Sequence, residues 1–213
     1  MRFKDRADAG RRLAQALTAY RNTKDAIVFA LPRGGVVLGV EVAKALHIPL
    51  DLVIPRKVGH PMQPEYAIAA VAESGQLATN PGEVERVDPD WFKQAVERER
   101  REAGRRRGLY LAGRPMPALA GKTAIIVDDG IATGLTMFAA IRDVRHAGAA
   151  RIVVAVPAAP AETAARLQRE VDEVVTLDNG EYYLGAVGAY YDSFPQVSDA
   201  EVIELLKPAA GEA

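Results

Sequence analysis

Short apolar runs alternate with amphipathic stretches along most of the chain. Apolar positions recur with helical spacing over residues 36–46, 136–147 and 161–171, and an N-terminal helix is predicted over residues 5–20. The apolar runs of strand length lie at residues 26–31, 50–54, 123–127, 151–156 and 173–177. This alternation predicts an α/β fold in which a mostly parallel, open sheet carries helices on both faces.

The alternation is interrupted after residue 66. Residues 67–72 and 76–79 flank a Ser-Gly turn and predict a hairpin. A long charged helix is predicted to follow the N-cap Asp88, with Pro89 at its first position, and to run to Gly108. These elements do not continue the strand–helix–strand pattern, so we expect a small embellishment beside the main sheet.

The length and the composition are those of one globular domain. Since a domain typically holds about 150 residues, the 213 residues allow a single domain, 1–213, with an insertion over residues 76–120. Hydrophobic residues make up 49% and charged residues 26% of the chain, which permits a sizeable core. The absence of cysteine excludes disulfides, thiolate zinc sites and a thiol nucleophile.

The charge balance gives little support for a nucleic-acid or membrane partner. The 27 Lys and Arg residues nearly match the 28 Asp and Glu residues. Residues 97–107 hold three Glu and six Arg, but pairs such as Glu97 with Arg101 and Glu102 with Arg106 favour a solvated helix. With a charged N-terminus and no apolar run of membrane length, the sequence predicts a cytoplasmic protein.

The most informative segment follows the apolar run that ends at Val127. Asp128 and Asp129 would lie beyond the carboxyl end of a strand, where open parallel sheets bind ligands. Paired carboxylates are acceptors that suit the two donors of a vicinal diol. The next residues lead into a helix, whose free N–H groups and hydroxyls suit a phosphate; they are Ala132, Thr133, Gly134, Leu135 and Thr136. Together they predict a site for a pentose 5-phosphate.

Residues 127–136, with the sequence VDDGIATGLT, resemble the phosphoribosyl diphosphate (PRPP) motif of type I phosphoribosyltransferases. The resemblance implies that Asp128 and Asp129 hold the ribose hydroxyls and that residues 132–136 hold the 5-phosphate. Residues 31–35, LPRGG, resemble the pyrophosphate loop of that family, and Arg56-Lys57 resembles the basic segment of adenine-type enzymes. The implied pyrophosphate ligands are Arg33, Gly34, Arg56 and Lys57. The resemblance also implies a C-terminal hood-like segment and tail over residues 178–213.

The resemblance implies transfer of the 5-phosphoribosyl group from PRPP to a purine-like nucleobase, as in purine salvage, with release of pyrophosphate. Arg33, Lys57 and a Mg²⁺ ion would stabilise the leaving diphosphate, and Asp128 or Asp129 would reach the ion through substrate or water. A homodimer is a further expectation from the family.

A mobile loop that excludes water is expected over residues 58–66, which are rich in proline. In adenine-type enzymes a Glu of this loop lies near the base. Glu65 is therefore a candidate catalytic residue, and an ordinary exposed Glu is the equal alternative. His60 stands where those enzymes tend to have another Lys.

The acceptor base is the least defined part of the reaction. Ala132 stands where hypoxanthine-type enzymes have an acid, as in adenine-type enzymes. Residues 186–192 faintly resemble a base-binding segment, which implies that Val187 and Tyr190 contact the base. Ala186 replaces the aromatic residue of that segment, and a tyrosine such as Tyr190 is more often a core residue.

The alternative function is a non-catalytic PRPP-sensing regulatory protein that binds nucleic acid through the arginines of residues 98–107. Such a sensor needs neither a pyrophosphate loop nor a catalytic loop, and the sequence holds candidates for both. Hydrolysis of a phosphorylated ribose is a third, minor alternative.

Overall fold

A computed structural model describes residues 1–178 and 182–207 of the protein. Within these residues the main sheet has the strand order β2-β1-β6-β7-β8, and every neighbouring pair is parallel. Its strands are β1 (Ala26–Ala30), β2 (Leu50–Leu52), β6 (Thr123–Val127), β7 (Arg151–Val156) and β8 (Glu173–Thr176). The predicted α/β fold with a mostly parallel sheet is confirmed.

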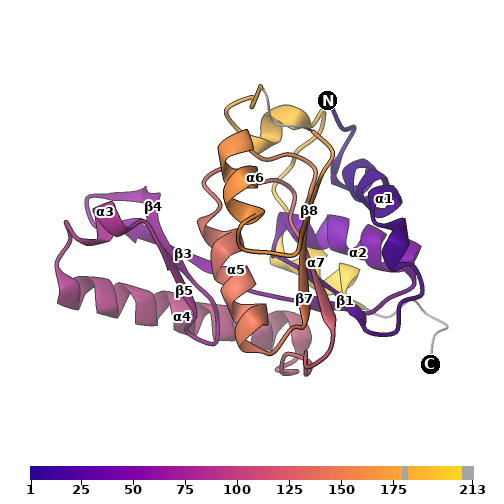
Figure 1. The fold of residues 1–213 in the computed structure, drawn as a ribbon. Coiled ribbons are helices and arrows are strands. Elements are labelled where there is room, and N and C mark those ends of the chain that lie inside the picture. The colour runs from indigo at the N-terminus through magenta and orange to yellow at the C-terminus, as the bar shows by residue number, and fades with distance from the viewer. Residues whose placement is uncertain (179–181, 208–213) are drawn as a thin grey trace.

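Helices cover both faces of this sheet, as Figure 1 shows. Helices α1 (Arg6–Ala16) and α2 (Gly34–Leu46) pack on one face, while α5 (Leu135–His146) and α6 (Ala161–Leu167) pack on the other. Along β6, Ile125 and Val127 face the α1 and α2 side, whereas Ala124 and Ile126 face the α5 side. Burial on both faces explains why the strands are apolar throughout instead of alternating.

A second, antiparallel sheet with the order β3-β4-β5 lies beside the main sheet. Its strands are β3 (Arg56–His60), β4 (Gln63–Val71) and β5 (Leu77–Thr79). The predicted hairpin is confirmed, since Val71 pairs with Leu77 and Ala69 with Thr79. The small sheet begins at Arg56, ahead of the insertion predicted over residues 76–120.

Residues 58–66, predicted to form a mobile loop, lie instead in the hairpin of β3 and β4. His60 pairs with Gln63 across the tip, and the ladder shifts register on either side of Gly59. A Cβ on Gly59 would lie 2.0 Å from the carbonyl oxygen of Pro64. Because glycine has no side chain, β3 can approach the backbone of Pro64 at this bulge. The sequence pattern did not reveal this close contact.

The long charged helix is α4 (Pro89–Leu111), which lies along the small sheet after the short α3 (Pro81–Val84). The Asp88 side chain accepts a hydrogen bond from the Trp91 N–H, which confirms the predicted N-cap. Glu102 pairs with Arg106 as predicted, and also with Arg105. Glu97 pairs with Arg100 instead of Arg101, because the i, i+3 position is equally within reach on a helix.

The C-terminal part of the described chain returns to the N-terminal helix. It holds the 3₁₀ helix Val187–Tyr190 and α7 (Asp199–Leu205), whose Ser198 and Glu201 form a capping box. The N–H of Phe3 donates to the carbonyl oxygen of Tyr190, which joins the N-terminal segment to the 3₁₀ helix. Of the predicted hood-like segment and tail, residues 179–181 and 208–213 lie outside the described residues. None of the described helices combines the length and apolar character needed to cross a membrane.

Candidate active site

A cavity of about 360 Å³ opens at the carboxyl end of the main sheet. Ala30 lies opposite both Leu52 and Val127 in the sheet, so the loops after these strands emerge together. The predicted site residues that line the cavity are Arg33, Gly34, Lys57, Asp128, Asp129, Ala132, Thr133, Gly134, Thr136 and Val187. The order and register of the strands thus assemble most of the predicted site, as expected at a sheet edge.

The acidic pair consists of two half-buried carboxylates with different partners. Asp128 Oδ1 accepts a hydrogen bond of 2.8 Å from the backbone N–H of Asp129. Asp129 Oδ2 accepts one of 2.7 Å from Nε of Arg6. Burial raises the pKa of Asp128, and the charge of Asp129 raises it further. Burial also raises the pKa of Asp129, while Arg6 opposes that shift.

Gly34 and Gly35 begin α2 directly beside this pair. A Cβ on Gly34 would lie 1.9 Å from Asp129 Oδ2, and one on Gly35 would lie 2.9 Å from Asp128 Oδ1. Only glycine allows the two loops to approach this closely. The backbone of the candidate pyrophosphate loop and the carboxylates of the candidate ribose site therefore line one compact space.

The N-terminus of α5 forms the opposite side of the cavity. Gly134 has φ +82° and caps the helix without a side-chain hydrogen bond, so the first N–H groups of α5 have no side-chain acceptor at this cap. Ala132 and Thr133 are exposed and Thr136 is half-buried. Leu135 is buried, so its side chain faces the core and only its backbone can serve a ligand. These features suit a phosphate dianion.

Arg33 has a carboxylate partner of its own. Nη1 of Arg33 lies 3.5 Å from Asp199 Oδ1, which also accepts a 2.6 Å hydrogen bond from the Tyr110 hydroxyl. Burial and this hydrogen bond raise the pKa of Tyr110 to about 12. Helix α7 and helix α4 thus hold Arg33 at the mouth of the cavity.

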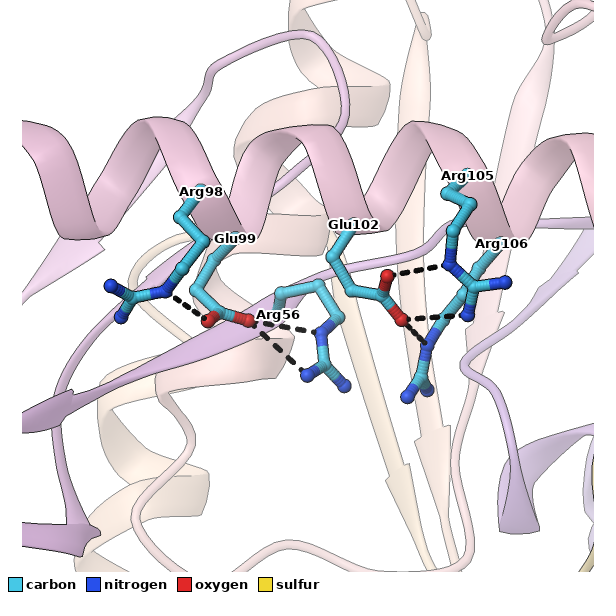
Figure 2. Close-up of polar contacts among 6 residues, drawn as sticks. All are labelled: Arg56, Arg98, Glu99, Glu102, Arg105 and Arg106. Atoms are coloured by element: carbon cyan, nitrogen blue, oxygen red, sulfur yellow. Dashed lines mark hydrogen bonds and ion pairs between the residues drawn. The ribbon is translucent and has the colours of Figure 1, made fainter.

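Arg56 does not line this cavity, contrary to the sequence prediction. Its Nε and Nη2 lie 3.3 and 3.2 Å from Oε2 of Glu99 on α4, and Arg98 contacts the other oxygen of Glu99 at 3.4 Å (Figure 2). The ion pair with Glu99, which is 43 positions away in the chain, holds the Arg56 side chain outside this cavity. The local sequence around Arg56 gives no sign of this ion pair. Lys57, on the other face of β3, remains in the cavity.

A second cavity of about 610 Å³ adjoins the first. Pro32, Pro55, Lys57 and Thr136 line both. Glu65 is exposed on β4 and lines only this second cavity, together with Arg56. The structure therefore separates Glu65 from the acidic pair.

Residues 2–193 match the family model described as the phosphoribosyl transferase domain. The chain belongs to this family. Two proteins of Mycobacterium tuberculosis, from strains H37Rv and CDC 1551, are provisionally named phosphoribosyl transferases and are 44% identical to it over 209 residues. The matches cover 97% of this chain and 47% of each relative, so the chain spans about half the length of these curated relatives. The crystal structure of TT1426 from Thermus thermophilus is 42% identical, covers 97% of this chain and 98% of its own, and has a TM-score of 0.80.

The part of the cavity that lies near Val187 differs from the sequence prediction. Val187 lines the cavity as predicted, and its side chain fills the space beside Gly130, where a Cβ would lie 2.6 Å from it. Tyr190 does not line it. Its side chain is 1% exposed, and its hydroxyl accepts a hydrogen bond from the N–H of Leu184. Tyr190 is therefore a core residue, the more frequent role of a tyrosine.

Sequence reasoning missed Arg6 and Phe194, which line the cavity in place of Tyr190. The chain did hold one signal for Arg6. It lies at helical spacing from Ala9 and Leu13, which are buried, so a charge stands on the apolar face of α1. A charge in that position needs a buried partner, and Asp129 is that partner.

Proposed function

We propose that the protein transfers the 5-phosphoribosyl group from PRPP to a nucleobase-like acceptor and releases pyrophosphate. The observation that carries the proposal is the single cavity in which the acidic pair, the N-terminus of α5 and the Arg33 loop meet. Membership of the phosphoribosyl transferase family supports it. Since the chain spans about half of its curated relatives, the proposal concerns the reaction of this domain.

Each side of the cavity has a role in this reaction. Asp128 and Asp129 accept hydrogen bonds from the ribose hydroxyls, and the first N–H groups of α5 with Thr133 and Thr136 hold the 5-phosphate. Arg33 and Lys57 face the diphosphate and stabilise its charge as it leaves. Because C1 passes through an oxocarbenium-like state, stabilisation of the leaving group replaces a covalent nucleophile.

The donor set suits a Mg²⁺ ion that is held largely by the substrate. Mg²⁺ is typically bound by one or two carboxylates together with substrate phosphates. The cavity offers the two carboxylates of Asp128 and Asp129, and no larger cluster of acidic or histidine ligands occurs among the described residues. When bound, the ion would neutralise diphosphate charge, and Asp128 or Asp129 would hold it directly or through water.

Purine salvage, a homodimer and a catalytic role for Glu65 remain parts of the proposal that rest on the family resemblance. Ala132 leaves no acid at the position that faces a purine in hypoxanthine-type enzymes. Glu65 lines the neighbouring cavity, so a role at the base requires the tip of the β3–β4 hairpin to move toward the acidic pair.

The observed charges disfavour the alternative of a PRPP sensor that binds nucleic acid through α4. Glu97, Glu99 and Glu102 occupy most of the arginines in the charged helix. Arg107 is 4% exposed and bonds to Asp51 and Glu73 within the protein. A helix whose arginines are mostly paired within the protein has fewer guanidinium groups free to neutralise the phosphates of a polyanion.

The proposal is tested by incubating the protein with PRPP, Mg²⁺ and a panel of nucleobases. We expect pyrophosphate release that requires both Mg²⁺ and a base, with the nucleotide product detected by mass spectrometry. The double change Asp128→Asn with Asp129→Asn should abolish release, whereas the exposed Asp25→Asn should not. Absence of PRPP binding in calorimetry would reject the proposal, and release without a base would indicate hydrolysis.

A further inference from the structure

The acceptor side of the cavity holds a guanidinium where a free aromatic ring face is expected. The Arg6 guanidinium carbon lies 3.7 Å from the centre of the Phe194 ring. The Tyr191 ring also stacks on Phe194, with centroids 4.8 Å apart. Phe194 is the aromatic residue of the cavity wall. Arg6 and Tyr191 thus cover much of the Phe194 ring, so a planar acceptor on this side of the cavity would contact Arg6 instead of the ring.

Arg6 is held firmly and yet retains donors for a ligand. Its side chain is 10% exposed, Nε donates to Asp129, and Nη1 donates to the carbonyl oxygen of Pro195 at 2.6 Å. Nη2 donates no hydrogen bond among the described residues, and it is not among their buried unpartnered atoms. Nη2 is therefore accessible, and the cavity is the space that Arg6 lines.

The surroundings of Nη2 determine which charge is favoured on the part of a ligand that contacts it. Val187 and Gly130, which also line the cavity, are apolar, and the carboxylate of Asp129 already accepts a hydrogen bond from Nε of Arg6. A guanidinium pairs best with a planar, negatively charged acceptor. In a largely buried cavity a cationic or purely donating edge would face Nη2 unfavourably.

We propose that Arg6 is the specificity-determining residue for the acceptor, and that the acceptor is a planar heterocycle that binds as an anion. This inference rests on the proposed phosphoribosyl transfer. The negative charge lies either on an ionised ring amide or on a carboxylate substituent, and both present the same oxygen-rich edge to Arg6.

The chemistry of the step agrees with an anionic acceptor. A ring nitrogen donates its electron pair to C1, and the bond between C1 and the diphosphate oxygen breaks. The electron pair of that bond leaves with the diphosphate, which departs as pyrophosphate. An acceptor whose acidic proton is lost before binding needs no general base, which is consistent with the separation of Glu65 from this cavity.

The test measures binding of matched acceptors by calorimetry, with ribose 5-phosphate present to fill the sugar site. Nicotinate against nicotinamide tests the carboxylate form, and xanthine against hypoxanthine tests the ionised ring. We expect the anionic member of at least one pair to bind at least tenfold more tightly to the unaltered protein. Arg6→Gln should reduce that preference to about onefold. Arg12→Gln, an exposed change on the same helix, should leave it intact.

The outcomes separate this inference from the proposed function. If ribose 5-phosphate or PRPP does not bind, phosphoribosyl transfer itself fails. If it binds but neither pair shows a preference, or if Arg6→Gln keeps the preference, the role of Arg6 is rejected. Circular dichroism checks each fold. Should Arg6→Gln fail to fold, the double change Arg6→Gln with Asp129→Asn leaves no buried charge unpaired, and it must lose the preference too.

Discussion

Two groups of carboxylates in this protein stand in opposite environments. Asp128, at the carboxyl end of β6, has a pKa raised by burial, and among the described residues its side chain accepts a hydrogen bond only from a neighbouring backbone N–H. Glu102, on α4, has a pKa lowered to about 2 by hydrogen bonds from Arg105 and Arg106 (Figure 2). A carboxylate that is fully paired on a surface helix has a structural role. One that is buried without a cationic partner in hydrogen-bond contact is poised to bind a ligand.

The two aspartates of the acidic pair also differ in whether they have a basic partner. Asp129 neutralises Arg6, whereas Asp128 bonds to no basic side chain among the described residues. We therefore expect the two aspartates to respond differently to the same substitution.

Asp129→Asn should have the largest effect on stability, because it leaves the buried charge of Arg6 unpaired. Breaking a buried ion pair from one side costs about 3 kcal/mol. The free energy of unfolding from urea titration measures this loss, with Asp25→Asn as the control. Adding Arg6→Gln should restore part of it, and a double variant less stable than Asp129→Asn would contradict the pairing.

Asp128→Asn should reduce phosphoribosyl transfer by about 100-fold, since it removes a charged acceptor for the ribose hydroxyls. It should also raise the melting temperature near pH 7. The folded-state pKa of Asp128 is raised, so the folded state binds more protons, and stability falls as pH rises through that pKa. Asparagine keeps the oxygen that accepts the Asp129 N–H and has no charge to bury. A lower melting temperature at pH 7 would show that Asp128 has a partner of its own.

Glu102→Gln should have the smallest effect, below about 1 kcal/mol, because its arginine partners remain near solvent. The pKa of Glu102 is lowered, so its contribution is present above the unfolded-state pKa and is lost as pH falls toward about 2. Urea titrations at pH 7 and pH 3, with and without added salt, measure this difference. A loss of transfer activity would contradict the purely structural role of Glu102.

Sequence patterns predicted the main sheet well because its strands β1, β6 and β7 are largely buried on both faces. The runs at residues 123–127 and 151–156 agree with β6 and β7 to the residue. The motif at residues 127–136 also lies where its pattern indicates, at the end of β6. Periodicity and capping act over a few residues, so a linear sequence carries them in full.

The errors involve residues whose environment comes from distant parts of the chain. Residues 58–66 contain two prolines and were predicted to be a loop, but they belong to the hairpin of β3 and β4. The register of this hairpin shifts on either side of Gly59, where a side chain would collide with Pro64. Arg56, a predicted pyrophosphate ligand, bonds to Glu99 and lines the adjoining cavity instead of the one that holds the acidic pair. Tyr190 looked like a base contact, and the core encloses it.

The sequence by itself determined the strands, the helix caps, the family motif and the chemistry of the acidic pair. All of these depend on neighbouring residues, whose geometry the backbone dictates. Only the tertiary structure decided that Arg6 lines the cavity and that Arg56 does not. Such choices depend on which charges lie within about 4 Å of each other and how deeply they are buried, and chain distance does not predict either. The net charge of -1 is a sum over residues in these separate environments, so it gave the least information about the site.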